Sequence, residues 1–265
     1  MDNVPDIEVK DKAWSLVREG LRRSLDLIYP PQCAGCRSNT QAPHGLCPHC
    51  WAETGFLVGA MCSTCARPLP GMGEAGLSCD ACLSDPPPWV AGAAAVSYEG
   101  AARRAILSFK HGDRLDLVPT FCGWLGRAAA PLLPGIDLVA SVPLHQGRLW
   151  TRGFNQSAEL ARAFSKEQGL NYVPSLLVRT KPTGSMRGLT KPQRQAVVKG
   201  AFEVAKGQSA QRMTGANILL VDDVMTTGAT LGACAEALLE QGAASVKVLC
   251  VARVEGQKGA VLPDI

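Results

Sequence analysis

Eight of the eleven cysteines stand in four closely spaced pairs. Two residues separate the members of each pair, and the pairs follow one another as Cys33-x2-Cys36-x10-Cys47-x2-Cys50 and Cys62-x2-Cys65-x13-Cys79-x2-Cys82. This spacing lets both thiolates of a pair turn toward one ion, and two pairs complete a tetrahedral Zn²⁺ site. The sequence therefore predicts two structural zinc sites, whose ligands are Cys33, Cys36, Cys47, Cys50, Cys62, Cys65, Cys79 and Cys82.

The sequence does not decide which two cysteine pairs share one zinc ion. Consecutive pairing is the simpler arrangement, and an interleaved one, first with third and second with fourth, is the alternative. Either way four sulfurs fill each site, so no open position is left for catalysis. Because the cysteines already suffice, we expect His44 and His49 to lie beside the ligands or at the surface. Cys122, Cys234 and Cys250 fall in helix or strand patterns and should be small core residues.

A second chemical pattern, ILLVDDVMTTGATL, spans residues 218–231. An apolar strand is expected to end at Val221, followed by two adjacent carboxylates and a loop rich in Thr and Gly. Ligands of open α/β sheets bind beyond the carboxyl ends of strands, and the N–H groups that open a helix favour an anion. The pattern thus predicts a sugar phosphate, with a ribose diol on Asp222 and Asp223. The alternative is an ordinary strand-to-helix turn with a threonine cap. A turn does not need two adjacent carboxylates at the end of a buried strand, where removing them from water costs free energy.

The elements that must position these residues alternate along the chain. Strand patterns cover residues 91–98, 136–142, 217–223 and 245–253, and helix patterns cover 101–110, most of 114–130, 155–169 and 230–242. This alternation predicts a mostly parallel α/β sheet flanked by helices.

Before the sheet, the chain has a different character. Residues 13–28 place apolar side chains on one face of a helix, and residues 33–82 carry the cysteine pairs among many Gly and Pro. We therefore expect three parts: an N-terminal amphipathic helix over 1–29, a double zinc ribbon over 30–85, and an α/β domain over 90–256.

The overall charge and the start of the chain restrict the location. A net charge of +4 suits an anionic small molecule or a weak nucleic-acid contact, and proves neither. The start, MDNVPDIEVKDK, is acidic and lacks the apolar run of a secretory signal, and no stretch has the ~20 apolar residues of a membrane span. We expect a cytoplasmic protein without a membrane span, in which cysteines bind metal instead of forming disulfides.

The acidic pair and its loop resemble the fingerprint of the type I phosphoribosyltransferases, which is four apolar residues, two acids and a TTGxT-like loop. The resemblance implies that the two acids contact the ribose hydroxyls of phosphoribosyl pyrophosphate and that Mg²⁺ bridges ribose and pyrophosphate oxygens. It also implies that the 5′-phosphate lies on Thr226, Thr227, Gly228, Ala229 and Thr230.

Two upstream motifs carry candidates for a pyrophosphate. The stretch SVPLHQGRLWTRGFNQSAELA, residues 141–161, places Arg148 and Arg152 in a loop before a helix that opens near Asn155. Arginines beside a helix N-terminus suit a phosphate group. The stretch RRAILSFKHGD places Lys110 just past a helix. If the protein turns over, Arg148 and Arg152 are the expected catalytic residues, because with Mg²⁺ they would stabilise the leaving charge.

The order of cysteine knuckles, LSFKHGD, VPLHxxRxxxRGFNQS and LLVDDVMTTGATL is similar to that of the ComF family over about residues 25–254. The resemblance implies a double zinc ribbon joined to a type I phosphoribosyltransferase domain, and a link to natural competence, DNA uptake and transformation, in the handling of incoming single-stranded DNA. Residues 185–202 correspond to the mobile loop of active transferases and its return. There Arg194 fits the family pattern, whereas Met186 and Val197 depart from it.

Two functions are therefore open. The first is a phosphoribosyltransferase-like protein that binds phosphoribosyl pyrophosphate and Mg²⁺. The second is a non-enzymatic adaptor or ligand sensor whose zinc ribbons contact DNA or a competence partner. Between Cys33 and Cys82 the only cationic residues are Arg37 and Arg67, against three acids. A partner dense in phosphate should require more Lys and Arg, which weakens the idea that the ribbons bind DNA directly.

Overall fold

The computed structural model describes residues 29–71, 76–112, 114–145, 147, 149, 153–182 and 188–255. The helix expected over residues 13–28 lies outside these ranges. Among the described residues, no helix combines the length and the apolar character needed to cross a bilayer.

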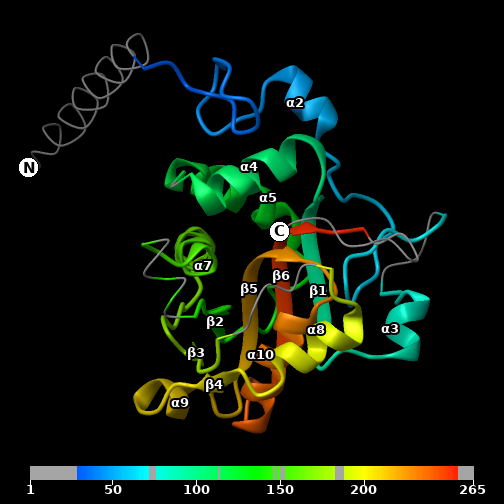
Figure 1. Ribbon diagram of the computed structural model, residues 1–265, viewed down its shortest axis with the longest axis vertical. Coiled ribbons are helices and arrows are strands. Elements are labelled where there is room, and N and C mark those ends of the chain that lie inside the picture. Colours follow the sequence, from blue (N-terminus) through cyan, green and yellow to red (C-terminus); the bar gives the residue numbers. More distant parts are fainter. Residues whose placement is uncertain are drawn as a thin grey trace, which may run out of the picture.

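Four parallel strands form the central sheet (Figure 1). In spatial order they are β1 (Ala91–Ser97), β6 (Ser245–Arg253), β5 (Asn217–Met225) and β2 (Leu138–Ser141). The two central strands pair along their whole length, from Asn217 opposite Ser245 to Met225 opposite Arg253. The expected parallel sheet is confirmed. Its strands are rich in apolar residues because helices bury both of its faces.

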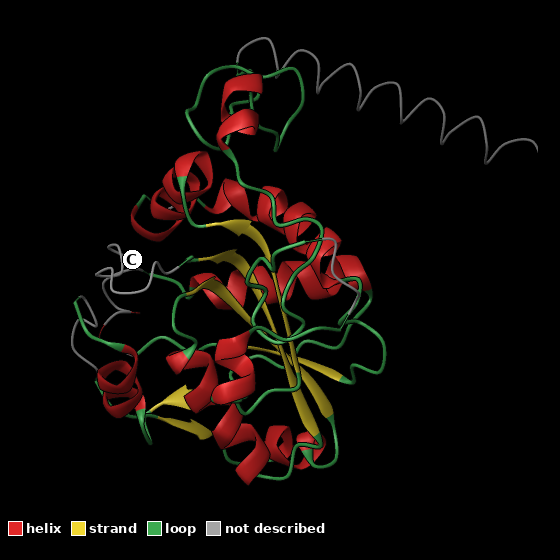
Figure 2. Cartoon of the chain, turned by 90° about the vertical axis from the view of Figure 1, so that its right-hand side faces the viewer, coloured by secondary structure: helices red, strands yellow, loops and turns green. Residues whose placement is uncertain are grey.

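Helices cover both faces of the sheet (Figure 2). One face carries α4 (Gly100–His111), a 3₁₀ turn (Leu115–Leu117), α5 (Val118–Ala129) and α7 (Gln156–Gln168). The other face carries α10 (Ala229–Glu240), with α8 (Lys191–Val198) and α9 (Gln208–Met213) near it. The phenylalanines Phe109, Phe121 and Phe164 fill the first face and have no exposed surface. A short antiparallel pair, β3 (Leu177–Arg179) and β4 (Phe202–Val204), lies beside α10 and was not expected from the sequence.

The two cysteine clusters pack on different parts of the domain. The first includes α2 (Pro48–Glu53) and lies against the start of α4, where Cys33, Cys50 and Ala101 form a small buried cluster. The second includes α3 (Asp80–Ser84) and belongs to the sheet core on the face of α10. The second cluster is therefore part of the packing of the sheet itself. The predicted bounds of the three parts stay a prediction.

Two expected element ends are wrong, and both errors concern candidate site residues. The central strand does not end at Val221 but continues to Met225, because the equally long β6 pairs with it over that length. Asp222 and Asp223 therefore lie within the strand. Lys110 does not follow a helix but lies in the last turn of α4, which continues to His111.

Candidate functional site

Each cysteine cluster gathers four sulfur atoms within 4.8 Å of one another. The first holds Cys33, Cys36, Cys47 and Cys50, and the second holds Cys62, Cys65, Cys79 and Cys82. The sulfurs of Cys36 and Cys47 are 3.7 Å apart, as are those of Cys65 and Cys79. A tetrahedron with Zn–S bonds of about 2.3 Å places its sulfurs about 3.8 Å apart, so both clusters fit Zn²⁺. Consecutive pairing is confirmed.

Backbone donors support the ligand role of the sulfurs. The Cys47 N–H donates to the Cys33 sulfur at 3.2 Å, and the Cys79 N–H donates to the Cys62 sulfur at 3.2 Å. Such bonds stabilise a thiolate, which is the form that binds metal. His49 is exposed and pairs with Glu53 at 3.2 Å, outside both clusters, as expected. The sites are closed and structural.

The carboxylate pair lies at the carboxyl end of β5. Asp222 Oδ1 accepts a hydrogen bond from the Ser157 hydroxyl at 2.7 Å and another from the Asp223 N–H at 2.9 Å. Burial raises the pKa of Asp222 to about 7; the negative charge of Asp223 adds to the rise, while the Ser157 hydrogen bond opposes it. Asp222 therefore changes charge near neutral pH.

Lys110 neutralises the second acid. Its Nζ lies 3.0 Å from Asp223 Oδ1, and the two side chains are only 7% and 12% exposed. The α4 helix lies above the end of the sheet (Figure 1), and Lys110 stands in its last turn. Lys110, predicted to bind pyrophosphate, is thus placed beside the carboxylate pair.

Two buried arginines hold the first residue of the loop. Arg194 donates from Nη1 to the Thr226 hydroxyl at 3.3 Å, and Arg253 donates from Nη1 to the Thr226 carbonyl at 3.1 Å. They are 5% and 6% exposed, and burial lowers the pKa of Arg194. Among the described residues, no group accepts a hydrogen bond from the buried Nε of Arg253. Two desolvated guanidinium groups at one loop make it a site for an anion.

Gly228 lies against Trp89. Its φ of +80° is left-handed, and it caps α10. A Cβ at this position would lie 2.8 Å from Cη2 of Trp89, so the glycine leaves room for the indole ring, and its expected role in the approach of a ligand stays a prediction. The Trp89 Nε1 in turn donates to the Thr64 carbonyl at 2.7 Å, between two ligands of the second zinc site. The second zinc ribbon therefore supports the loop through the Trp89 side chain.

The remaining candidates divide into those that the structure places and those that lie outside it. Asn155 caps α7: its Oδ1 accepts from the N–H groups of Ser157 and Ala158, and its Nδ2 donates to the Val142 carbonyl. Its described contacts are thus to the protein backbone. Arg148 and Arg152 lie outside the described residues. Thr227 accepts from the Ala229 N–H at 3.4 Å and so shapes the start of α10.

Three contributors were missed from the sequence: Ser157, Arg253 and Trp89. Ser157 stands within the helix motif that was quoted, in the first turn of α7, and its hydroxyl could have been matched to the acids. Arg253 ends an apolar strand parallel to β5, so its charge at the same sheet edge was a usable signal. Trp89 falls between the expected zinc ribbon and the expected α/β domain, and nothing local indicates that it reaches the loop.

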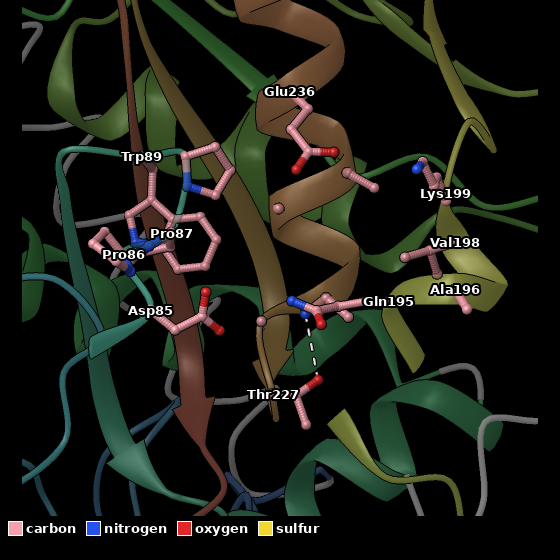
Figure 3. Close-up of a pocket in the computed structure, with 15 residues that line it drawn as sticks. Asp85, Pro86, Pro87, Trp89, Gln195, Ala196, Val198, Lys199, Thr227 and Glu236 are labelled. Atoms are coloured by element: carbon pink, nitrogen blue, oxygen red, sulfur yellow. Dashed lines mark hydrogen bonds between the residues drawn. The ribbon is translucent and has the colours of Figure 1, made fainter. Parts of the chain in front are cut away.

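A cavity of about 340 Å³ lies next to the loop (Figure 3). It is bounded by the linker residues 85–89, by α8 and by α10. Figure 3 shows Trp89 and Pro87 on one side of α10 and Val198 and Lys199 on the other, with Gln195 extending toward the start of α10. The loop is therefore open on the side of α8.

Comparisons with known proteins agree with this geometry. The family model of the double zinc ribbon domain matches residues 24–83, and that of the phosphoribosyl transferase domain matches residues 151–263. The DNA utilization protein YhgH of Escherichia coli (strain K12) is 31% identical over 235 residues, which cover 86% of this chain and 99% of that protein.

Two further relatives have competence in their names. Competence protein F of Haemophilus influenzae is 27% identical, covering 84% of this chain and 96% of that protein. Competence protein ComFC of Bacillus subtilis (strain 168) is 26% identical, covering 87% of this chain and 88% of that protein. By its motifs, its two four-cysteine sites and these full-length relatives, the chain belongs to the ComF family, in which a double zinc ribbon is joined to a type I phosphoribosyltransferase domain.

Proposed function

We propose that the protein binds phosphoribosyl pyrophosphate together with Mg²⁺ at the carboxyl end of β5. One observation carries the proposal: a carboxylate pair stands directly before an anion loop on which two buried arginines converge. A ribose 5-phosphate presents the matching groups, namely a diol and a phosphate a few bonds apart. The type I phosphoribosyltransferase domain supports the same ligand.

The loop suits the 5′-phosphate. Residues 226–228 precede α10, and Ala229 and Thr230 begin its first turn, whose free N–H groups and dipole favour an anion. Arg194 and Arg253 add positive charge that burial leaves poorly screened. A phosphate on this loop supplies an acceptor for these donors, including the buried Nε of Arg253.

The acids suit the ribose diol. Among the described residues, the contacts of both carboxylates fall on Oδ1, so we assign the ribose hydroxyls to Oδ2 of Asp222 and Asp223. Carboxylate oxygens are also the donors that Mg²⁺ prefers. Asp223 is already paired with Lys110, and the pKa of Asp222 is near neutral, so the two carboxylates carry little free negative charge for a metal ion. The site therefore suits a Mg²⁺ ion that is held chiefly by oxygens of the bound ligand and by water. When bound, Mg²⁺ would neutralise charge on the pyrophosphate.

If the protein turns over, a base nitrogen attacks C1′ of the ribose, and the bond from C1′ to the pyrophosphate oxygen breaks with its electron pair leaving on that oxygen. Arg148 and Arg152 are proposed to stabilise that charge. The acids and the loop hold the ribose while this happens, so catalysis rests on positioning and electrostatics.

The names of the relatives support a cellular role. Two of them are competence proteins by name, and a third is a DNA utilization protein. We propose for this protein a role in natural competence, in the handling of incoming single-stranded DNA, within the cytoplasm. All eleven cysteines are free of disulfides, which suits a reducing compartment.

Titration calorimetry with phosphoribosyl pyrophosphate and Mg²⁺ tests the ligand. We expect the wild type to bind and Asp222→Asn to lose most of the affinity. Glu240→Gln, which removes an exposed acid at the far end of α10, should bind as the wild type does. Absence of binding by the wild type, or equal binding by Asp222→Asn, would overturn the proposal. Pyrophosphate release with a panel of nucleobases then separates an enzyme from a ligand sensor.

A further inference from the structure

The 340 Å³ cavity and the anion loop are continuous along two elements. Thr227, Gly228 and Ala229 line this cavity and also the small cavity above the loop. On α8, Arg194 lines the small cavity, and the next residue, Gln195, lines the large one. An anion on the loop would therefore have an open space beside it, and a group attached to that anion could extend into it.

The shape of the large cavity suits a flat ring. One wall consists of three consecutive prolines, residues 86–88, and the edge of Trp89, while Val198 belongs to the opposite wall. The floor is made of Gly232 and Ala233, which present little side chain. A volume of about 340 Å³ lies within the range of small-molecule sites. The proline rings and the Trp89 edge favour a flat ring, which buries one face against them.

The polar residues of the cavity specify the ring further. Asp85 and Glu236 place carboxylates at its two ends, and Lys199 supplies a single cation (Figure 3). The negative charge of Glu236 disfavours a phosphate at the end of the cavity that lies away from the loop. Carboxylates accept hydrogen bonds from amino groups, which adenine, guanine and cytosine carry. A neutral nucleobase with an amino group therefore fits this end of the cavity.

We propose that the protein takes a nucleoside diphosphate ribose, in which a ribose 5-phosphate is joined through a second phosphate to a nucleoside. The terminal ribose lies on the acid pair and its phosphate lies on the loop. The second phosphate lies beside residues 227–229, which border both cavities, and the nucleoside lies in the large cavity between the prolines and α8. This inference rests on the proposed phosphoribosyl site and extends it by a subsite.

Calorimetry with ribose 5-phosphate and ADP-ribose separates the subsite from the phosphoribosyl site. We expect ADP-ribose to bind about tenfold more tightly, because one base is buried against the apolar wall of the cavity. Ala233→Leu fills the floor of the cavity and should remove this tenfold gain while leaving ribose 5-phosphate unchanged. Ala128→Leu, at a similarly half-buried position on α5, is the matched control and should change neither affinity.

The outcomes distinguish the two proposals. If ribose 5-phosphate binds but ADP-ribose gains nothing, or if its gain survives Ala233→Leu, the subsite is wrong and the phosphoribosyl site stands. If neither compound binds, and phosphoribosyl pyrophosphate does not bind either, the phosphoribosyl site fails and the subsite fails with it.

Discussion

Substitution of Gly228 by alanine tests whether the indole of Trp89 supports the anion loop. Two costs should add. A left-handed φ of +80° costs an L-residue about 1–2 kcal/mol, and a Cβ at 2.8 Å from Cη2 of Trp89 adds an overpacking cost of about 1–3 kcal/mol. The free energy of unfolding should therefore fall by about 2–5 kcal/mol, measured by urea denaturation of the zinc-loaded protein.

Gly169 provides the matched control. It ends α7 with a φ of +67°, and a Cβ there would meet nothing within 4 Å. Gly169→Ala should therefore cost only the backbone component, about 1–2 kcal/mol. The difference between the two variants isolates the contact with the indole.

A double-mutant cycle locates that contact. Trp89→Phe removes Cη2, so Gly228→Ala should cost about 1–3 kcal/mol less in the Trp89→Phe background than in the wild type. The reasoning is refuted if Gly228→Ala costs no more than Gly169→Ala, or if the effects of Gly228→Ala and Trp89→Phe on the free energy of unfolding are additive.

Three further predictions concern charge and metal. Because burial raises the pKa of Asp222 to about 7, the folded protein holds this proton more tightly than the unfolded chain. The contribution of Asp222 to the free energy of unfolding is greatest at low pH and is lost as the pH rises through 7, by roughly 2–3 kcal/mol between pH 5 and pH 8. Urea denaturation at both pH values should show this slope in the wild type, and Asp222→Asn should flatten it; an equal slope in both proteins would contradict the assignment. Lys110→Met leaves the buried Asp223 unpaired and should lower the free energy of unfolding by about 3–5 kcal/mol. Adding Asp223→Asn should restore most of this loss, and additive costs of the two substitutions would show that the pair does not interact. Cys36→Ser and Cys65→Ser should each reduce the zinc content by one ion. Because only Cys65 lies in the sheet core, Cys65→Ser should show the larger fall in melting temperature. Equal falls would contradict that placement.

Features encoded in short, local patterns were predictable. The cysteine pairs and the DDxxTTGAT loop each carry their chemistry within a few residues, and the alternation of long apolar and amphipathic segments sufficed for the parallel sheet. The same holds for α7, where Asn155 caps the helix start and Gly169 ends it with a left-handed φ.

Features that depend on contacts between distant segments were not predictable. The strands β3 and β4 have three residues each, too few for a periodic signal. Trp89 follows a run of prolines, and only the fold brings its ring to Gly228. By contrast, α8 had a usable local signal that was overlooked: Thr190 and Gln193 form a capping box, with a proline in the first turn.

The order of the strands has a consequence for how the protein is made. Within the described sheet, β1 pairs only with β6, and β6 is the last strand of the described residues. The other edge of β1 bonds to the segment before it, where the Leu57 N–H donates to the Ala95 carbonyl and the Ser97 N–H donates to the Gly55 carbonyl. During synthesis β1 must therefore wait for residues up to Arg253 to leave the ribosome before it can join the sheet. Both cysteine clusters precede β1 and emerge first, so zinc can fold them while the sheet is still incomplete. A nascent chain that lacks zinc would meet this delay with its N-terminal third unfolded, so the supply of metal at the ribosome should govern the yield of folded protein.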